Sequence, residues 1–593
     1  MVNDANSRAH MEPLLPSTNG SPTSTPKYRR GSLKLLLGLS LIIIGGSLYV
    51  LTHFSRLPVQ PAHKAILIEA KHGAVAADDK TCSQIGVQVL KDDGNAVDAA
   101  IAAALCIGVI NSFSSGIGGG GFMVIRNSTG AEVIDFREEA PAKAHREMYK
   151  DNPKLAQHGG LAVGIPGELR GFEEAHKRYG KLPWKRLFEP SIKLSREGFR
   201  VTSELAKRIE IMKPQISKIP SFLEVFAPNG EFFKEGDIMK RESFANTLET
   251  VARKGAKAFY NGPIAESLVK EIQRTGGIIE LEDFSNYRAH IRVPMVGYYR
   301  GHKIITAPPP ASGAILLSIL NILEGYSLDR DSLTSLHAHH ILESFKFGYA
   351  QRTELGDPDY VDIGARIAQF VDKGHAALIR QNISNSQTFS TEHYKPRFEG
   401  KESPGTTHLS TVDKDQLSVA LTSTINLYFG SQVLDLNTGV ILNNEMDDFS
   451  IPGVSNSFNL PPSPNNFVEP KKRPFSSSVP TITEFNGELE LVLGASGGSR
   501  ITTAVIQTLI NAIDFRMNLA SAVEYPRLHH QLIPDVAYYE SEYPNDIQDE
   551  LSKRKHEILP MPFHAVVQAI RRLPDGLIHA VSDPRKQGVA DGY

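Results

Sequence analysis

The chain has 593 residues, with 64 Lys and Arg against 66 Asp and Glu, and only two cysteines. It is long enough for a large buried core and longer than one ordinary domain. The net charge of −2 argues against a nucleic-acid partner, because such proteins present a basic face. Without a Cys-x-x-Cys pair, a thiolate zinc site or a dithiol redox motif is not expected.

The N-terminus predicts a membrane anchor. Residues 1–34 are rich in Ser, Thr, Pro and Asn, end in a basic cluster, and are expected to form a disordered cytosolic tail. Residues 35–54 are mostly apolar and about long enough to span a bilayer as a signal anchor. The basic cluster then stays cytosolic and the rest of the chain is lumenal or extracellular. A cleaved signal peptide is the alternative, disfavoured by the long basic tail and the lack of a nearby cleavage site.

This topology bears on several other features. Asn127 and Asn382 begin N-glycosylation sequons that would face the glycosylating side of the membrane. The compartment would be oxidising, so Cys82 and Cys106 either pair as a disulfide or remain two buried thiols. Residues 12–15, Glu-Pro-Leu-Leu, match an acidic dileucine sorting signal, which leaves a vacuole-like membrane and the cell surface both open as locations.

From residue 71 the patterns predict a folded region of mixed α and β structure. Residues 55–64 read as a short stalk. Residues 203–274 are expected to be largely helical with breaks, and 384–405 to form an exposed, irregular processing loop. Apolar periodicity predicts helices over 81–91, 97–110, 167–179, 184–197, 314–323 and 335–353, and strands over 74–77, 122–126, 132–136, 293–299, 302–307, 409–412, 417–425 and 489–493.

Two stretches invite other functions. The glycine run 116–121 lacks a following Gly-Lys-Ser/Thr and precedes a strand where a phosphate loop needs a helix, so we expect it to let backbone segments approach closely. His339 and Glu343 are four residues apart and share one helix face. A zinc hydrolase would require further ligands, and none is evident, so we interpret the pair as helix packing and surface and predict no metal.

Residues 403–410, Ser-Pro-Gly-Thr-Thr-His-Leu-Ser, combine a glycine with two threonines at the entry to a strand. Without a Cβ, Gly405 can hold its peptide bond in a strained geometry. Thr406 can attack that bond, and the cleaved chain would then carry a threonine with its own α-amine as base. An ordinary turn is the alternative, and Thr407 is equally eligible from these residues alone.

The stretches that follow settle the choice. They are 422–430 (Thr-Ser-Thr-Ile-Asn-Leu-Tyr-Phe-Gly), 442–449, 461–464, 473–478 and 494–498, preceded by 136–141 (Phe-Arg-Glu-Glu-Ala-Pro) and 163–190. In this order they resemble the γ-glutamyltransferase (glutathione hydrolase) family of N-terminal-nucleophile hydrolases, over residues 74–593. The resemblance implies an α+β fold, the four-layer αββα sandwich. It also implies autocleavage between Gly405 and Thr406 into a large chain (55–405) and a small chain (406–593) that remain a heterodimer.

The resemblance also assigns the site. Thr406 matches the nucleophile and Thr424 the threonine that supports it. Arginine provides a forked donor for a substrate carboxylate, acidic and amide oxygens accept from an ammonium, and glycine N–H groups can stabilise an oxyanion. The family's substrate-binding positions fall on Arg137, Ser476 and Ser477 for the α-carboxylate, Asn426, Glu445 and Asp448 for the α-ammonium, and Gly497 and Gly498 for the oxyanion.

The implied reaction is ping-pong. The γ-glutamyl group of glutathione, a glutathione S-conjugate or another γ-glutamyl compound forms an ester on Thr406 and passes to water or to an amino acid or dipeptide. No metal or organic cofactor is expected. One rival is an acylase of the same fold that cuts another amide, which the carboxylate- and amine-binding set disfavours. The other is a membrane-tethered protein that keeps the fold without processing, which an uncut chain would identify.

Overall fold

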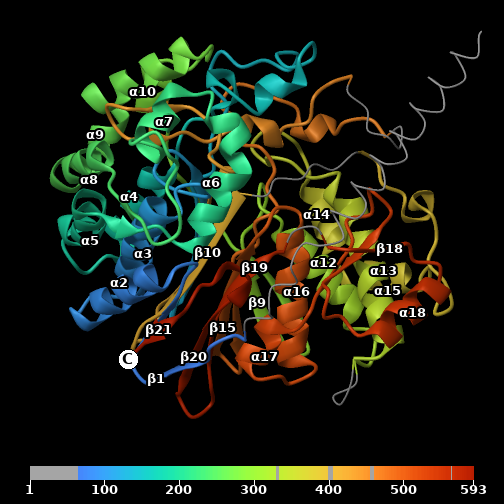
Figure 1. The fold of residues 1–593 in the computed structure, drawn as a ribbon. Helices are drawn as coiled ribbons and strands as arrows, with labels where there is room; N and C mark the ends of the chain where they lie inside the picture. Colours follow the sequence, from blue (N-terminus) through green and yellow to red (C-terminus); the bar gives the residue numbers. More distant parts are fainter. Residues whose placement is uncertain (1–63, 329–332, 399–404, 454–459, 562–563) are drawn as a thin grey trace, which may run out of the picture. The chain divides into compact units, whose positions relative to one another are not determined.

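The computed structural model describes residues 64–328, 333–398, 405–453, 460–561 and 564–593. These residues form a mixed α+β sandwich in which two β-sheets stack face to face (Figure 1). The predicted tail (1–34), membrane anchor (35–54) and most of the stalk lie outside the described residues. Within those residues, no helix combines the length and apolar character that a membrane crossing requires.

Both large sheets are antiparallel and have seven strands each. The first sheet runs in the order β21 (Asp591–Gly592), β2 (Ala74–Ala76), β10 (Gly405–Val412), β11 (Ser418–Asn426), β3 (Gly120–Asn127), β4 (Gly130–Asp135) and β7 (His290–Arg292). The second runs β1 (Ile68–Ala70), β20 (Ile578–Ser582), β19 (Val566–Arg572), β15 (Glu488–Ser496), β14 (Thr481–Phe485), β9 (His302–Thr306) and β8 (Met295–Tyr299).

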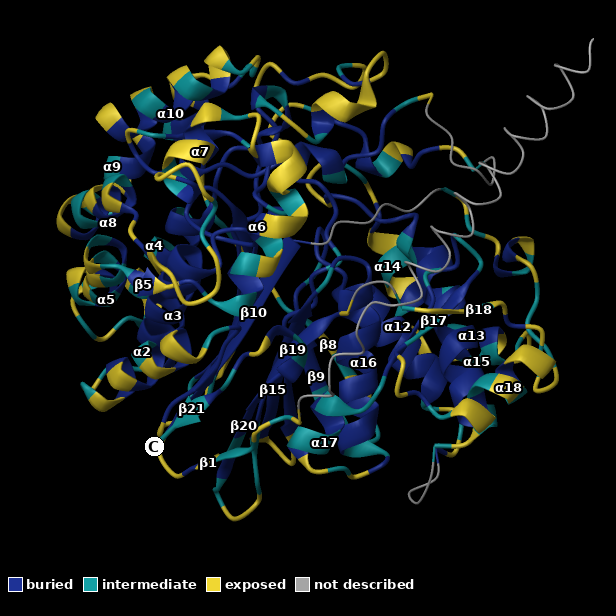
Figure 2. Cartoon of the chain, viewed as in Figure 1, coloured by how far each residue is buried: buried dark blue, intermediate teal, exposed yellow. Residues whose placement is uncertain are grey.

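The sheets meet through their central strands, because β10 packs against both β15 and β19. Apolar side chains from both sheets, among them Phe122, Val124, Ile482 and Val492, form one buried cluster. Helices cover the two outer faces. The first sheet carries α3 (Ala96–Ile110) and α4 (Glu168–Tyr179), and the second carries α12 (Gly313–Leu323), α16 (Arg500–Ile513) and α17 (Leu519–Glu524). Figure 2 shows the strands buried and the outermost helix faces exposed.

The remaining helices surround these layers, and the first of them also packs against β2 and β21 of the first sheet. They are α2 (Lys80–Lys91), α5 (Trp184–Glu197), α6 (Ser203–Ile216), α7 (Pro220–Phe226), α8 (Glu242–Lys254), α9 (Lys257–Tyr260), α10 (Pro263–Arg274), α11 (Leu281–Asn286), α13 (Ser335–Arg352), α14 (Gly364–Phe370), α15 (Lys373–Arg380) and α18 (Asn545–Lys553). Short strands complete the described elements: β5 (Phe199–Arg200) with β6 (Ile238–Met239), β12 (Leu434–Asp435) with β13 (Val440–Ile441), and β16 (Leu528–His529), β17 (Ala537–Tyr539) and β18 (Ile558–Pro560).

A disulfide joins the first two helices. α3 begins at a capping box of Asn95 and Asp98, and every residue of this helix is buried, as its dense Ala, Ile and Leu content predicted. Cys82 of α2 is bonded to Cys106 of α3. The structure therefore decides between the two possibilities for the cysteines in favour of the disulfide.

Most predicted elements are confirmed to within a few residues. The main difference is at β10, which starts at Gly405, whereas the apolar pattern placed the strand start at residue 409. Because Thr406 and Thr407 are polar, the alternation of apolar residues does not extend to the first residues of this strand. The glycine run has its predicted role, since a Cβ at Gly119 or Gly121 would lie 2.0 Å from a backbone oxygen of β11.

Candidate active site

The proposed cleavage point is a backbone irregularity in the middle of the first sheet. Gly405 is paired with Asn426 and Thr406 with Thr424, so the register shifts between Gly405 and Thr406. A β-bulge of this kind kinks the strand and redirects its side chains. A Cβ at Gly405 would lie 2.4 Å from the backbone oxygen of Asn426, so only glycine fits here.

The two threonines face opposite sides of the strand. Thr406 lines a pocket, whereas the hydroxyl of Thr407 donates to Asp78 at 2.6 Å in the buried interior. Lys586 also contacts Asp78, and its Nζ donates to the carbonyl of Thr406 at 3.3 Å. Thr407 is therefore engaged in the core, which leaves Thr406 as the hydroxyl available to a substrate.

Thr424 connects both sides of the Gly405–Thr406 bond. Its Oγ1 accepts from the backbone N–H of Asn426 at 2.8 Å and donates to the carbonyl of Gly405 at 2.5 Å. Its single proton is used by the carbonyl, so the 3.3 Å contact between the hydroxyls of Thr406 and Thr424 has Thr406 as the donor. The hydroxyl of Thr424 thus polarises the carbonyl that would be attacked.

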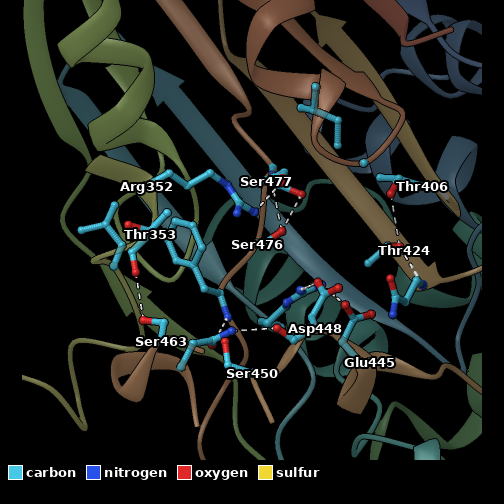
Figure 3. Close-up of a pocket in the computed structure, with 18 residues that line it drawn as sticks. Arg352, Thr353, Thr406, Thr424, Glu445, Asp448, Ser450, Ser463, Ser476 and Ser477 are labelled. Atoms are coloured by element: carbon cyan, nitrogen blue, oxygen red, sulfur yellow. Dashed lines mark hydrogen bonds and ion pairs between the residues drawn. The ribbon is translucent and has the colours of Figure 1, made fainter. Parts of the chain in front are cut away.

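Thr406 and Thr424 lie at one end of a pocket with about 630 Å³ of empty space, its open mouth included (Figure 3). The pocket also contains seven further residues predicted from sequence: Arg137, Asn426, Glu445, Asp448, Ser476, Ser477 and Gly498. The structure therefore gathers almost the whole predicted set around one cavity.

Opposite charges lie side by side in this pocket. Arg137 follows β4 and is buried, with Glu445 on its Nη1 and Asp448 on its Nη2. Its Nε donates to the carbonyl of Pro474 at 3.2 Å. Glu445 and Asp448 are the ends of a 3₁₀ turn, where side chains three residues apart point the same way. A cation beside two anions matches a zwitterionic α-carbon, whose carboxylate and ammonium are equally close together.

The protonation of this cluster follows from its burial. Burial alone would lower the pKa of Arg137, but Glu445, Asp448 and Glu138 outweigh it and raise the pKa, so the guanidinium stays charged. Burial raises the pKa of Glu138 to about 7 and raises the pKa of Glu445 well above its usual range, against the opposing effect of Arg137. The two carboxyl groups are therefore coupled and retain a proton between them at mildly acidic pH.

Hydrogen bonds to backbone and side-chain groups orient the amide and hydroxyl groups of the pocket. Asn426 has a positive φ of 73°, and its Nδ2 donates to the carbonyl of Asn444 at 3.0 Å. This leaves its buried Oδ1 with no hydrogen-bond partner among the described residues. Ser476 Oγ donates to Ser478 at 3.1 Å, and Ser477 Oγ accepts from Arg352 at 2.7 Å. An unpaired Asn426 oxygen in a binding pocket is a ready acceptor for an ammonium.

The glycine pair forms the junction between β15 and α16. Gly497 and Gly498 have φ values of 125° and 63°, which other residues rarely adopt. A Cβ at Gly497 would lie 2.8 Å from the Cα of Ala565. Gly498 lines the pocket, whereas Gly497 lies just outside the lining. The position at a helix N-terminus suits N–H donors for an oxyanion.

Sequence reasoning missed several residues of this site. Glu138 is one of them, because it is fully buried behind Arg137. Arg352, at the end of α13, packs its guanidinium on the ring of Phe475 at 5.0 Å and lines the far wall. Thr353, Leu355, Ser450, Ser463, Asn466, Ser478 and Ile501 complete the lining. No local sequence pattern marks these residues as part of a pocket. The polar pair Arg352 and Thr353 at the end of α13 is the feature that could have suggested one.

The nearest histidine in the strand is not part of this chemistry. His408 lies two residues after Thr406, but its ring is buried against Gly494 of the second sheet and bonded to Thr422 and Ser410. Burial lowers its pKa to about 3, so the ring is neutral. Among the described residues that line the pocket there is no histidine or lysine. A base for Thr406 must therefore come from elsewhere.

The two predicted glycosylation sites lie at the surface. Asn127 is in the turn between β3 and β4, where its Oδ1 accepts from Thr129 at 2.9 Å. Asn382 is exposed just after α15. Both positions are accessible to modification, and neither contributes to the pocket.

Comparison with known proteins agrees with this geometry. The family described as Gamma-glutamyltranspeptidase matches residues 82–593. "Glutathione hydrolase proenzyme 1" of Schizosaccharomyces pombe is 46% identical over 541 residues, which are 89% of this chain and 85% of that protein. The solved structure of γ-glutamyltranspeptidase from Helicobacter pylori is 33% identical, with a TM-score of 0.53, and covers 57% of this chain and 97% of its own.

A cephalosporin acylase from Bacillus halodurans is similar over a longer stretch. It has a TM-score of 0.79 at 25% identity and covers 91% of this chain and 98% of its own. A protein named as an acylase therefore shares this fold, and the family of the chain is decided by the sequence match rather than by the fold. On that basis the chain belongs to the gamma-glutamyltranspeptidase family.

Proposed function

We propose that this chain is a γ-glutamyltransferase and glutathione hydrolase that activates itself by cutting the Gly405–Thr406 bond. The observation that carries the proposal is the arrangement of one pocket. The hydroxyl of Thr406, next to the register shift of β10, lines the same pocket as Arg137 and its two flanking carboxylates. The named relatives, glutathione hydrolases among them, support the same activity.

In the uncut chain, the hydroxyl of Thr406 is the nucleophile and the Gly405 carbonyl is the target. Thr424 donates to that carbonyl and so stabilises the charge that develops on its oxygen. Attack forms an ester between Gly405 and Thr406 Oγ1 and breaks the peptide bond, and water then hydrolyses the ester. Residues up to 405 become the large chain, and residues from 406 become the small chain with a free α-amine at Thr406.

In the cut protein, that α-amine serves as base, since the ordinary pKa of an α-amino group, near 8, suits proton transfer around neutral pH. The Gly405 carbonyl no longer occupies Thr424, whose hydroxyl is then able to orient Thr406. Arg137, Ser476 and Ser477 hold the substrate α-carboxylate. Asn426, Glu445 and Asp448 hold its ammonium, and Gly497 and Gly498 face the oxyanion. The acyl group passes to water, an amino acid or a dipeptide.

The decisive assay compares two classes of amide on the purified protein. Release of p-nitroaniline from γ-glutamyl-p-nitroanilide, lost in Thr406→Ala together with processing, is the expected result. Turnover of cephalosporin-type amides without turnover of γ-glutamyl amides would instead assign the acylase function. An uncut, inactive wild-type chain on a denaturing gel would contradict both enzyme functions.

We further propose that residues 35–54 anchor the protein in a membrane with the sandwich on the lumenal or extracellular side. The Cys82–Cys106 disulfide and the accessible sequons at Asn127 and Asn382 support an oxidising, glycosylating compartment. Protease protection of the domain in sealed vesicles, with an endoglycosidase mobility shift lost in Asn127→Gln and Asn382→Gln, tests this topology. Digestion of the domain in sealed vesicles would instead show that the sandwich lies on the cytosolic side of the membrane. Imaging with and without Leu14 and Leu15 separates an internal membrane from the cell surface.

A further inference from the structure

A second cluster of reactive side chains lies away from the pocket, where α13, α18 and β18 pack together (Figure 1). His339 and Glu343 come from one face of α13, and His556 comes from the segment between α18 and β18. All three are buried, and one ligand atom of each lies within 4.8 Å of the others. The third ligand that the sequence did not reveal is therefore supplied from 217 residues away.

The hydrogen bonds fix which atoms face the centre of this cluster. Nε2 of His339 bonds to the carbonyl of Ser384 at 2.6 Å, and a carbonyl can only accept, so this nitrogen carries the proton. With its proton on Nε2, the neutral ring carries its lone pair on Nδ1, the nitrogen that faces His556. A backbone carbonyl that orients a histidine in this way is a common outer partner of metal-binding imidazoles.

His556 lies directly against that lone pair. Its Nε2 is 2.7 Å from Nδ1 of His339, so His556 donates a proton there. Its other nitrogen, Nδ1, is buried without a hydrogen-bond partner among the described residues. The ring is thus held by one polar contact and is free to exchange that proton for a cation.

Glu343 completes the set with an oriented carboxylate. The hydroxyl of Thr388 donates to its Oε1 at 2.6 Å, and the hydroxyl of Tyr394 lies 2.7 Å from Oε2. Both donors come from one segment beyond α15, which closes over the cluster. Hydrogen-bonded carboxylates of this kind are typical of metal ligands.

The charges around the cluster leave a net deficit of positive charge. Lys346 is close, with its Nζ 2.9 Å from the hydroxyl of Thr388, but it is paired with Asp535 at 2.7 Å. His530 also faces Asp535 and is neutral, since burial lowers its pKa to about 4. His340 turns to Asn385, and Arg554 is paired with Glu550 at the edge. Among the described residues, Glu343 is the carboxylate of this cluster that has no ion-pair partner, so a divalent ion would be stabilised.

We propose that His339, Glu343 and His556 form a structural zinc site that no catalytic step uses. Two imidazoles and a carboxylate, with water in the fourth position, form a tetrahedral site that zinc accepts. Tetrahedral geometry places two zinc-bound nitrogens about 3.4 Å apart. From the 2.7 Å in this structure, the two rings need to separate by roughly 0.7 Å. None of the three residues lines the active-site pocket.

The site has a consequence for the processed protein, which rests on the proposed cleavage. His339 and Glu343 precede Gly405 and His556 follows it, so the ion would link the large and small chains after the backbone is cut. It would also fix α13, the helix that carries Arg352 to the pocket wall. Zinc would then help to hold the large and small chains together after the peptide bond between them is cut.

The test measures metal in the full-length, processed protein by mass spectrometry after dialysis without a strong chelator. We expect about one zinc per chain. His556→Gln keeps a donor for His339 but ligates zinc poorly, so zinc content should fall by roughly tenfold or more. The matched control is His340→Asn, which alters the neighbouring buried histidine outside the ligand set and should retain the ion.

Two further measurements separate a zinc site from a hydrogen-bonded histidine pair. Zinc sulfate added to metal-stripped protein should raise the melting temperature of the wild type but not of His556→Gln, and Co²⁺ should give visible bands of a tetrahedral site in the wild type only. Wild-type protein without zinc, with no thermal shift on zinc addition, would overturn the proposal. These readouts do not depend on transferase activity, so a failure here leaves the proposed function intact.

Discussion

Replacing Thr424 by valine tests the polarised Gly405 carbonyl most directly. Valine keeps the shape of threonine and removes only the hydroxyl that donates to Gly405. Loss of a single oxyanion donor costs about 10²–10³ in rate, or about 2.7–4 kcal/mol, in enzymes generally. We therefore expect autocleavage to slow by at least about 10²-fold, while the precursor accumulates.

The same substitution has a calculable effect on folding. The N–H of Asn426 loses its acceptor at 2.8 Å in a buried site, which costs about 1–3 kcal/mol of stability. That is less than the 5–15 kcal/mol typical of a folded domain, so the variant should fold. Thr424→Ser is the matched control, because it retains the hydroxyl and should process within a few-fold of the wild type.

The assay follows the uncut chain on a denaturing gel over time and sequences the new N-terminus. Thermal melting of each precursor establishes that it is folded. If folded Thr424→Val matures as fast as the wild type, the hydroxyl of Thr424 does not activate the Gly405 carbonyl. Slow maturation of both Thr424→Val and Thr424→Ser would show that packing of the γ-methyl matters more than the hydrogen bond.

Four further predictions concern the substrate site, the pH dependence of stability and the disulfide. Arg137→Lys replaces a two-pronged contact by a point charge and should raise KM for γ-glutamyl-p-nitroanilide about tenfold or more with a smaller change in kcat, and an unchanged KM would contradict the assigned role. The wild-type kcat/KM should rise with pH through about 7, as the proton shared by Glu138 and Glu445 leaves. In Glu138→Gln this rise in kcat/KM should occur at lower pH, because a neighbouring negative charge no longer raises the pKa of Glu445. Folding raises the pKa of Glu138 from 4.5 to about 7, so its contribution to the free energy of unfolding is complete below about pH 4.5 and is lost as pH rises past about 7. Calorimetry should find this loss of stability reduced in Glu138→Gln. Substitution of both Cys82 and Cys106 by serine should cost about 3 kcal/mol for a loop of 24 residues, seen as a lower urea midpoint, and an unchanged midpoint would refute this.

Local patterns in the sequence predicted the elements that depend on local physics. Apolar spacing gives α3 and α13 nearly to the residue, because one helix face or a whole helix must be buried. The three-residue spacing of Glu445 and Asp448 places both carboxylates on one side of a turn, and the structure confirms it. Ordered motifs supplied the family, and with it the residues of the pocket.

Long-range placement was decided by the tertiary structure alone. Arg137 meets Asp448 across 311 residues because the turn that carries Asp448 packs against β11 of the first sheet, which also contains β4 just before Arg137, and no local pattern encodes that contact. Thr406 faces the pocket and Thr407 faces the core because one side of β10 lies against the pocket and the other against the interior. Burial made Glu138 part of the site rather than a surface residue, and packing of α13 on α18 brought His556 to His339. A sequence specifies side-chain chemistry at each position, but proximity between distant segments arises only when the sheets and helices pack.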